Sequence, residues 1–353
     1  MTVSDRLASR ANGITLLRLG LAVLVVLGHA WEVGGFGPDP LQRTAGVSCG
    51  EMGVNALFGL SGYLVTQSWL RSRSGWNYLW RRALRIFPGF WLFLFLGALG
   101  LCPALWARQH GIRWLDAFGQ APFLGYIGHN FLLRIRQPGI GDLFAAHPAA
   151  GVVDGSLWSL FPEFLCYLGV ALAGLLGWFA PRRTPWLWLV GAITFAAHAS
   201  GPTILSHLSG PIQGSAWYLW RLSTQASFFF TGALVCIHGS RLPAGWRPAG
   251  AILLLLGVAT YAGAYAWTGP WLLPLLLLEI AALTSSAWLD RVGDYSYGIY
   301  VYHYPLQQTL VFFGLGASAV LTFFGLTCAL VLPAAVVSWH LVEKPALRLK
   351  RYY

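Results

Sequence analysis

The chain has 353 residues, of which 56% are hydrophobic and only 10% are charged. Soluble domains carry about 25% charged residues, so this composition excludes a soluble protein. The net charge of +11 alone would suit a nucleic-acid-binding protein. The basic residues, however, lie between long apolar runs, where the positive-inside rule places cytoplasmic loops, and we expect no nucleic-acid partner.

Apolar runs long enough to cross a bilayer follow one another along the chain, since a helix needs about 20 residues to do so. Breaks at charges and at Pro/Gly clusters predict about ten transmembrane helices. They fall near residues 14–33, 51–70, 86–107, 156–179, 186–205, 217–238, 249–267, 271–289, 296–315 and 318–341. The sequence therefore predicts an all-α, polytopic integral membrane protein that forms a single domain over residues 1–353.

The distribution of Lys and Arg predicts the orientation of these helices. Most of the 23 Lys and Arg residues fall in segments that are cytoplasmic if both termini are cytoplasmic. The last segment then forms a cytoplasmic tail from about residue 342. Segment 108–155, which carries several Arg and Asp residues, becomes an outer loop with interfacial or re-entrant pieces. No Cys/His spacing typical of a metal site occurs, so we expect no bound metal.

The first apolar stretch, "LRLGLAVLVVLGHAW", contains Arg18 and His29. They are eleven residues apart, close to three helical turns, so both face the same side of one helix at roughly 16 Å separation. Polar groups within a membrane span are costly and favour a functional reading. The alternatives are a snorkelling anchor for Arg18 and a buried histidine bonded to a neighbouring helix for His29.

A basic cluster precedes the third span in "NYLWRRALRIFPGFW". Arg82 and Arg85 are three residues apart on a helix that enters from the cytoplasm, with Arg81 beside them. Guanidinium groups suit bidentate binding of phosphate. The alternative is an ordinary positive-inside cluster, although Arg85 lies among apolar residues and borders the membrane.

Further polar residues interrupt later spans. In "GSLWSLFPEFLCY", Glu163 is a membrane carboxylate, which is a functional candidate by default, and Ser159 lies four residues earlier after Trp158. "GDYSYGIYVYHYPL" contains Tyr297 and also His303, two residues before Pro305. These side chains are candidate supporting residues.

Two other motifs stand beside these. "GVNALFGLSGYLV" carries Ser61, but its spacing is not that of a nucleophile elbow, and its glycines favour close helix approach. In "LVEKPALRLKR", Glu343 and Pro345 are predicted to end the final helix at the inner surface.

Together these features favour an enzyme that takes a phosphate-bearing donor from the cytoplasm and performs base chemistry on an acceptor reached from the other side. A histidine with an ordinary pKa near 6.5 is a natural general base for a hydroxyl group. Glu163 is a candidate to orient His29.

In this order the motifs resemble those of the membrane acyltransferase-3 family, which O-acylates bacterial surface glycans. The resemblance runs from Arg18 to about Arg351. It implies that Arg18 and His29 form the family's R-x10-H pair, and that Arg82 and Arg85 form its R-x-x-R motif. Glu163 then corresponds to the acidic residue of W-[ST]-x-x-x-E, after Trp158 and Ser159. Where the family commonly has "WSLSVEEQFY", this chain has "WSLFPEFLCY".

The resemblance also implies the reaction. Family members transfer an acyl group, usually acetyl, from cytoplasmic acyl-CoA to sugar hydroxyls of surface glycans, with acyl-CoA as co-substrate and no bound cofactor. The acceptor is a surface glycan or its lipid-linked precursor, and the protein lies among the lipids of the bacterial inner membrane. Arg82 and Arg85 are expected to hold CoA phosphates and Arg18 to position the donor. His29 then deprotonates the acceptor or transiently accepts the acyl group.

Two other classes of function remain open. A transporter or flippase of a glycan or lipid-linked precursor fits the midplane polar residues and the interrupted helices. The lack of repeated halves and the concentration of arginines at one mouth count against it. A structural scaffold leaves His29 and Glu163 unexplained.

Overall fold

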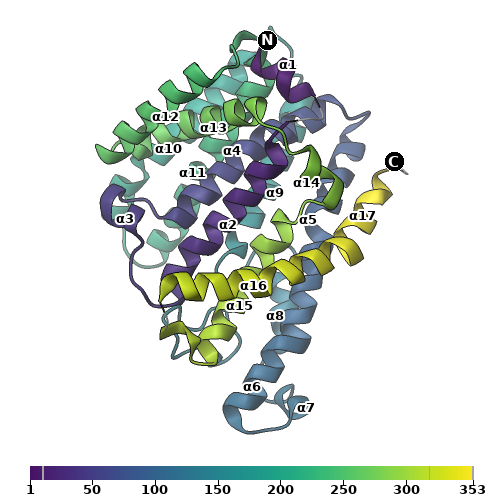
Figure 1. Ribbon diagram of the computed structural model, residues 1–353, viewed down its shortest axis with the longest axis vertical. Helices are drawn as coiled ribbons and strands as arrows, with labels where there is room; N and C mark the ends of the chain where they lie inside the picture. Colours follow the sequence, from purple (N-terminus) through teal and green to yellow (C-terminus); the bar gives the residue numbers. More distant parts are fainter. Residues whose placement is uncertain (10–11, 318, 352–353) are drawn as a thin grey trace.

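The computed structural model describes residues 1–9, 12–317 and 319–351 and is built from helices (Figure 1). In these residues the only β-type pairing is an isolated bridge between Thr2 and Pro243. The predicted all-α class is confirmed. The end of the predicted cytoplasmic tail, residues 352–353, lies outside the described residues.

Each predicted span falls mainly on one long helix. These helices are α2 (Ile14–Val33), α4 (Cys49–Leu70), α5 (Gly75–Leu96), α9 (Leu160–Leu175), α10 (Thr184–Ser206), α11 (Gly210–His238), α12 (Trp246–Tyr261), α13 (Tyr265–Leu283), α15 (Ser296–Phe312) and α16 (Val320–Ser338). The shorter helices are α1 (Val3–Ala8), α3 (Pro40–Ala45), α6 (Cys102–His110), α7 (Trp114–Ala117), α8 (Phe123–Asn130), α14 (Ala287–Val292) and α17 (Lys344–Arg348).

Among the described residues, 6 helical runs are long and apolar enough to cross a membrane. They are Ile14–Val33, Gly75–His110, Leu157–Leu175, Thr184–Ser206, Tyr265–Leu283 and Val320–Arg348. These runs fit a multi-pass membrane protein. Ten spans and cytoplasmic termini stay predictions.

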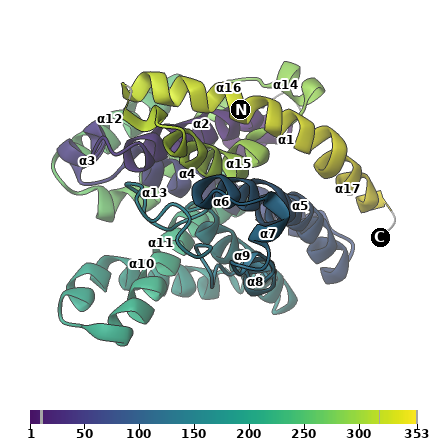
Figure 2. The same ribbon diagram turned by 90° about the horizontal axis from the view of Figure 1, so that it is seen from below.

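The central helices α4 and α11 are not among these runs, and they have the most extensive mutual contact in the fold. Both carry buried polar side chains, such as Asn55 and Gln225, that other helices cover. In Figure 1, α2 and α4 lie side by side, and α2 also contacts α15 and α16. Figure 2 shows α16 and α17 along one edge of the molecule and α10 toward the opposite edge.

Glycines allow the close approach of these central helices. A Cβ atom at Gly62 of α4 would overlap the carbonyl oxygen of Phe229 in α11, and one at Gly28 of α2 would overlap the backbone of Gly50. The backbones therefore touch where these helices cross, which is the packing that small residues permit in membranes. The predicted role of the glycine-rich motif in α4 is confirmed.

Several predicted boundaries differ from the structure. The span predicted at 271–289 ends at Leu283, because the chain then turns and Ser286 donates from both its backbone N–H and its hydroxyl to the carbonyl of Asn12. The helix of the third predicted span, α5, starts at Gly75, where the Ser74 hydroxyl caps it. The helical run then continues through a π-helical turn and α6 to His110. Arg82 and Arg85 lie on this helix, as predicted.

The last helix does not end at Pro345. A π-helical turn at Trp339–Glu343 is followed directly by α17, where the proline occupies the first turn. Proline has no backbone N–H to donate, and it lies directly after the π-helical turn, where the regular α-helical hydrogen-bond pattern is already interrupted. Segment 108–155 contains α7, α8 and irregular backbone. Its position on the outer side stays a prediction.

Candidate active site

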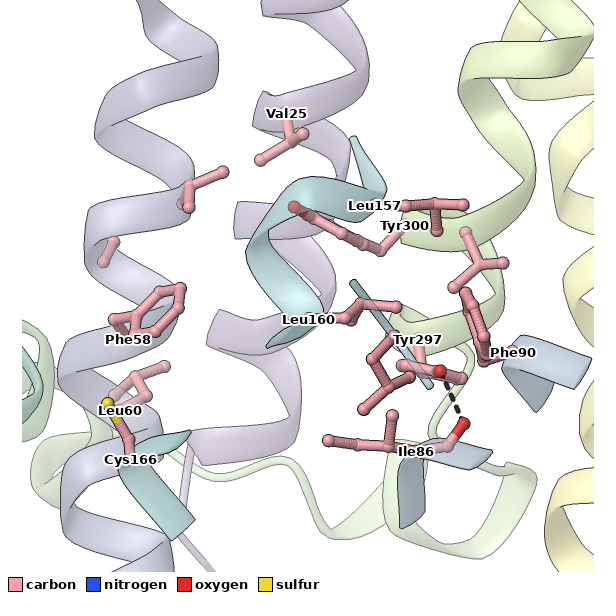
Figure 3. Packing of buried hydrophobic residues seen from close by; sticks show 14 of the residues in the cluster. Val25, Phe58, Leu60, Ile86, Phe90, Leu157, Leu160, Cys166, Tyr297 and Tyr300 are labelled. Atoms are coloured by element: carbon pink, nitrogen blue, oxygen red, sulfur yellow. Dashed lines mark hydrogen bonds between the residues drawn. The ribbon is translucent and has the colours of Figure 1, made fainter. Parts of the chain in front are cut away.

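A cavity of about 110 Å³ lies where α2, α4, α5, α9 and α15 meet. It brings together most of the predicted site residues, namely Arg18, Ser61, Arg82, Arg85, Ser159, Glu163 and Tyr297. Figure 3 shows part of its apolar surroundings, with Phe58, Leu160 and Tyr297 and the 2.7 Å hydrogen bond from the Tyr297 hydroxyl to the carbonyl of Ile86. This hydrogen bond fixes the ring of Tyr297 against α5.

Two arginines of the cavity share one carboxylate. Arg18 from α2 and Arg85 from α5 both donate to Oδ2 of Asp294, Arg85 at 2.7 Å. Oδ1 of Asp294 accepts from the hydroxyl of Ser296 at 2.5 Å. Burial alone would raise the pKa of Asp294, but the charges of Arg18 and Arg85 outweigh it and hold this pKa below its ordinary value. Arg18 is thus an ion-paired residue rather than a snorkelling anchor.

Asp294 was missed by the sequence reasoning. Its only signal is the acidic residue at the start of "GDYSYG", just before α15. In a sequence, a carboxylate at a helix end usually indicates a solvated charge or a helix cap. Only the tertiary contact with Arg18 and Arg85 shows that Asp294 belongs to the site.

Glu163 enters the cavity from the first turn of α9. Its Oε1 accepts hydrogen bonds from the hydroxyl of Ser61 at 3.1 Å and from that of Tyr167 at 2.6 Å. Pro162 lies in the same first turn, where proline causes no loss of a helical hydrogen bond. Ser61 therefore has a polar partner in the site.

Ser159 lies just before α9, in a 3₁₀ turn at Leu157–Ser159, and it lines the cavity together with Glu163. The Ser159 hydroxyl lies 2.5 Å from the hydroxyl of Tyr300 and donates to the carbonyl of Ser156.

His29 is not part of the cavity lining and does not pair with Glu163 as expected. Its Nδ1 lies 2.8 Å from Nε2 of His303, and the two rings stack with centroids 5.0 Å apart. Tyr304 meets the ring of His29 edge-on at 5.2 Å. The predicted supporting histidine is therefore the direct partner of His29.

Tyr300 connects the cavity with this histidine pair. Its ring lines the cavity, and its backbone carbonyl lies 2.8 Å from Nδ1 of His303. Tyr300 thus belongs to the cavity lining and also contacts His303, which in turn contacts His29.

Comparison with known proteins identifies the family. Residues 11–340 match the acyltransferase-3 family, which is described as an acyltransferase domain. The chain belongs to this family.

Two curated relatives cover almost the whole of this acyltransferase. It is 27% identical to "Nodulation protein 10" of Rhizobium leguminosarum bv. viciae, over 98% of this chain and 96% of that protein. It is also 27% identical to an "O-acetyl transferase" of Shigella phage Sf6, over 95% of this chain and 96% of the phage protein. No solved structure matches the chain. The family and this similarity support O-acyl transfer by an O-acetyltransferase-like enzyme.

The two remaining predicted site residues of this acyltransferase lie outside the cavity. The ring of Trp158 stacks against Arg221 at 4.4 Å, and Arg221 pairs with Glu51 at 3.0 Å. Glu343 is buried in the π-helical turn and accepts from the hydroxyl of Ser338 at 2.9 Å. The first contact joins the turn before α9 to α11, whereas the second lies within the last helical run, and neither residue lines the cavity.

The C-terminal segment adds a further cation near the site. Lys350 follows α17, and this part of the chain packs against α5. Burial, together with the charges of Arg85, Arg82, Arg81 and Arg18, lowers the pKa of Lys350 to about 8. In the described parts of the chain, no three His, Cys, Asp or Glu side chains are grouped to hold a metal ion.

Proposed function

We propose that this acyltransferase transfers an acyl group, with acetyl as the expected group, from cytoplasmic acyl-CoA to a sugar hydroxyl. The acceptor is a cell-surface glycan or its lipid-linked precursor, and the site of action is the bacterial inner membrane. The observation that carries the proposal is the convergence of Arg18, Arg82 and Arg85 on one cavity, whose lining residue Tyr300 contacts the His29–His303 pair.

The arginines support an anionic donor. Arg18 and Arg85 share the single carboxylate of Asp294, and Arg82 forms no ion pair within the described residues. The guanidinium of Arg82 lies instead over the ring of Tyr167, at 5.7 Å from its centre. A partly buried cation without a carboxylate partner is stabilised by a bound anion, and the planar guanidinium matches phosphate oxygens bidentately. Coenzyme A supplies such phosphates.

His29 supports the chemical step in either of two ways. As a base, its ring takes the proton of the sugar hydroxyl while the hydroxyl oxygen attacks the thioester carbonyl. The carbon–sulfur bond then breaks, and the departing thiolate takes up a proton. As an acyl carrier, a ring nitrogen attacks the thioester first, the thiol leaves, and the sugar hydroxyl then removes the acyl group from the ring.

The relatives add to this proposal. The phage protein is named an O-acetyl transferase, which favours acetyl as the group and oxygen as the acceptor atom. The acyl-CoA donor and the glycan acceptor rest on the motif resemblance and on the cationic cavity.

The test uses inverted membrane vesicles that contain the wild-type protein or His29→Ala, supplied with acetyl-CoA labelled in the acetyl group. We expect loss of thioester and transfer of label to glycan in wild type, and a fall of about 100-fold or more in His29→Ala. His207→Ala, at an exposed position directly after α10, is the matched control and should keep the wild-type rate. Absence of turnover with any common acyl-CoA, together with CoA-independent movement of glycan, would instead establish a transporter.

A further inference from the structure

We propose that His303 is a positioning residue that fixes the proton of His29 on Nδ1, so that Nε2 of His29 holds the reactive electron pair. The inference rests on the proposed function, because it assigns an atom within that reaction.

The chain of hydrogen bonds begins at the backbone of α15. Nδ1 of His303 lies 2.8 Å from the carbonyl oxygen of Tyr300 and 3.2 Å from that of Ile299. A carbonyl oxygen only accepts, so Nδ1 of His303 must carry a proton. In a neutral imidazole the other nitrogen then has no proton and can only accept. Nε2 of His303 is therefore an acceptor.

The tautomer of His303 determines the tautomer of His29. Nδ1 of His29 is 2.8 Å from Nε2 of His303, so Nδ1 of His29 must be the donor of that hydrogen bond. Nε2 of His29 is then unprotonated. No hydrogen bond to this atom occurs in residues 1–9, 12–317 and 319–351, which leaves it available to a substrate.

A doubly protonated His303 would reverse the direction of the bond between the rings. The side chain of His303 is completely buried, at 0% exposure. No carboxylate of the described chain forms a hydrogen bond with either ring, and a buried unpaired cation is strongly unfavourable. The neutral form, and with it the donor role of His29, is the form that this environment supports.

The two histidines differ in access, which assigns their roles. His29 is partly exposed, whereas His303 is enclosed. Gln307, four residues after His303, donates to the carbonyl of Val26 at 3.0 Å and so holds α15 in register with α2. His303 is therefore the fixed inner ring, and His29 is the ring that a substrate can reach.

This arrangement serves both chemical routes. Removing the hydroxyl proton and attacking the thioester carbonyl each use an unprotonated ring nitrogen, and Nε2 of His29 supplies it. When that nitrogen gains a proton or an acyl group, the ring becomes positive. Its Nδ1–H then donates a stronger hydrogen bond to Nε2 of His303.

The test reads the tautomer of His29 directly by ¹⁵N NMR of histidine-labelled enzyme in lipid bilayers, with the signal assigned by its loss in His29→Gln. We expect Nδ1 protonated in wild type and in His303→Gln, whose amide oxygen can accept in place of Nε2. His303→Leu should lose this preference. Its kcat should fall about 100-fold with the KM for acetyl-CoA unchanged, whereas His303→Gln should keep most of the activity.

His198→Leu is the matched control, because His198 is also a buried histidine that contacts a backbone carbonyl, that of Ala266, but it lies outside the cavity lining. It should leave kcat unchanged. An Nε2-protonated His29 in wild type, or equal losses in His303→Gln and His303→Leu, would overturn the proposal. If His303→Leu does not fold, the spectra of wild type and His303→Gln still test the proposal, because both must show Nδ1 of His29 protonated. If His29→Ala retains acyl transfer, the proposed function is overturned instead. The NMR spectra would still report separately on whether His303 controls the tautomer of His29.

Discussion

Arg85 donates a hydrogen bond of 2.7 Å to Asp294, and this contact joins α5 to the start of α15. Asp294 also receives Arg18 from α2. One carboxylate thus holds three parts of the chain together beside the cavity. It also holds two of the three cavity arginines in fixed positions before any substrate is present.

Asp294→Asn keeps the shape of this side chain and removes its charge. Since a partly buried ion pair is broken, we expect the free energy of unfolding to fall by about 1–3 kcal/mol at neutral pH. Because the pKa of Asp294 is lowered in the folded protein, its contribution is present above its unfolded pKa of about 3.9 and is lost as the pH falls further. Thermal unfolding in detergent should therefore show a Tm difference from wild type that shrinks below about pH 4. Asp290→Asn, at an exposed position of α14, is the control. A difference that does not change with pH would contradict a charge effect.

Arg82→Lys keeps the positive charge and removes the planar fork that binds phosphate bidentately. We expect the KM for acyl-CoA to rise about 10-fold while kcat changes little. Arg81→Lys makes the same exchange one residue earlier, outside the cavity lining, and should have little effect. Steady-state kinetics on vesicles measure both variants. Equal effects of the two would show that only the summed charge of the cluster matters.

Lys350→Met tests the cation contributed by the C-terminal segment. With its pKa lowered to about 8, Lys350 is mostly charged at pH 7 and mostly neutral at pH 9. Because a charged lysine attracts an anionic donor, the variant should raise the KM for acyl-CoA about 2- to 5-fold at pH 7, as expected for a partly screened pair. The ratio of the variant's KM to that of wild type should approach one above about pH 9. A ratio that is the same at both pH values would place Lys350 away from the donor.

Gly62→Ala tests the crossing of α4 and α11. The added methyl would overlap the carbonyl oxygen of Phe229, so the helices must separate, and we expect a loss of at least about 1–3 kcal/mol in stability. Gly250→Ala in α12 meets no atom within 4 Å. It should raise stability slightly, because alanine is the better helix former. Thermal unfolding of the two variants should therefore shift in opposite directions.

The sequence was sufficient for features that depend on helical periodicity and composition. The helical class, the placement of Arg82 and Arg85 on one helix and the close approach at Gly62 follow from local patterns, whereas the grouping of Arg18 with these arginines was implied only by the family resemblance. Contacts between distant segments were not accessible in this way. Asp294 reaches its arginines only because the start of α15 lies beside α2 and α5.

The partners of the two predicted catalytic residues show the same limit. Glu163 bonds Ser61 and Tyr167, and His29 bonds His303, whereas the sequence suggested that Glu163 and His29 act together.

The carbonyl oxygen that faces Nδ1 of His303 belongs to the main chain at Tyr300. Every amino acid at position 300 would present the same oxygen while α15 stays helical. Mutation of the Tyr300 side chain can therefore alter the arginine cavity and leave the protons of the two imidazoles where they are. The proposed donor region can therefore diverge between related enzymes without disturbing the proposed reactive nitrogen of His29.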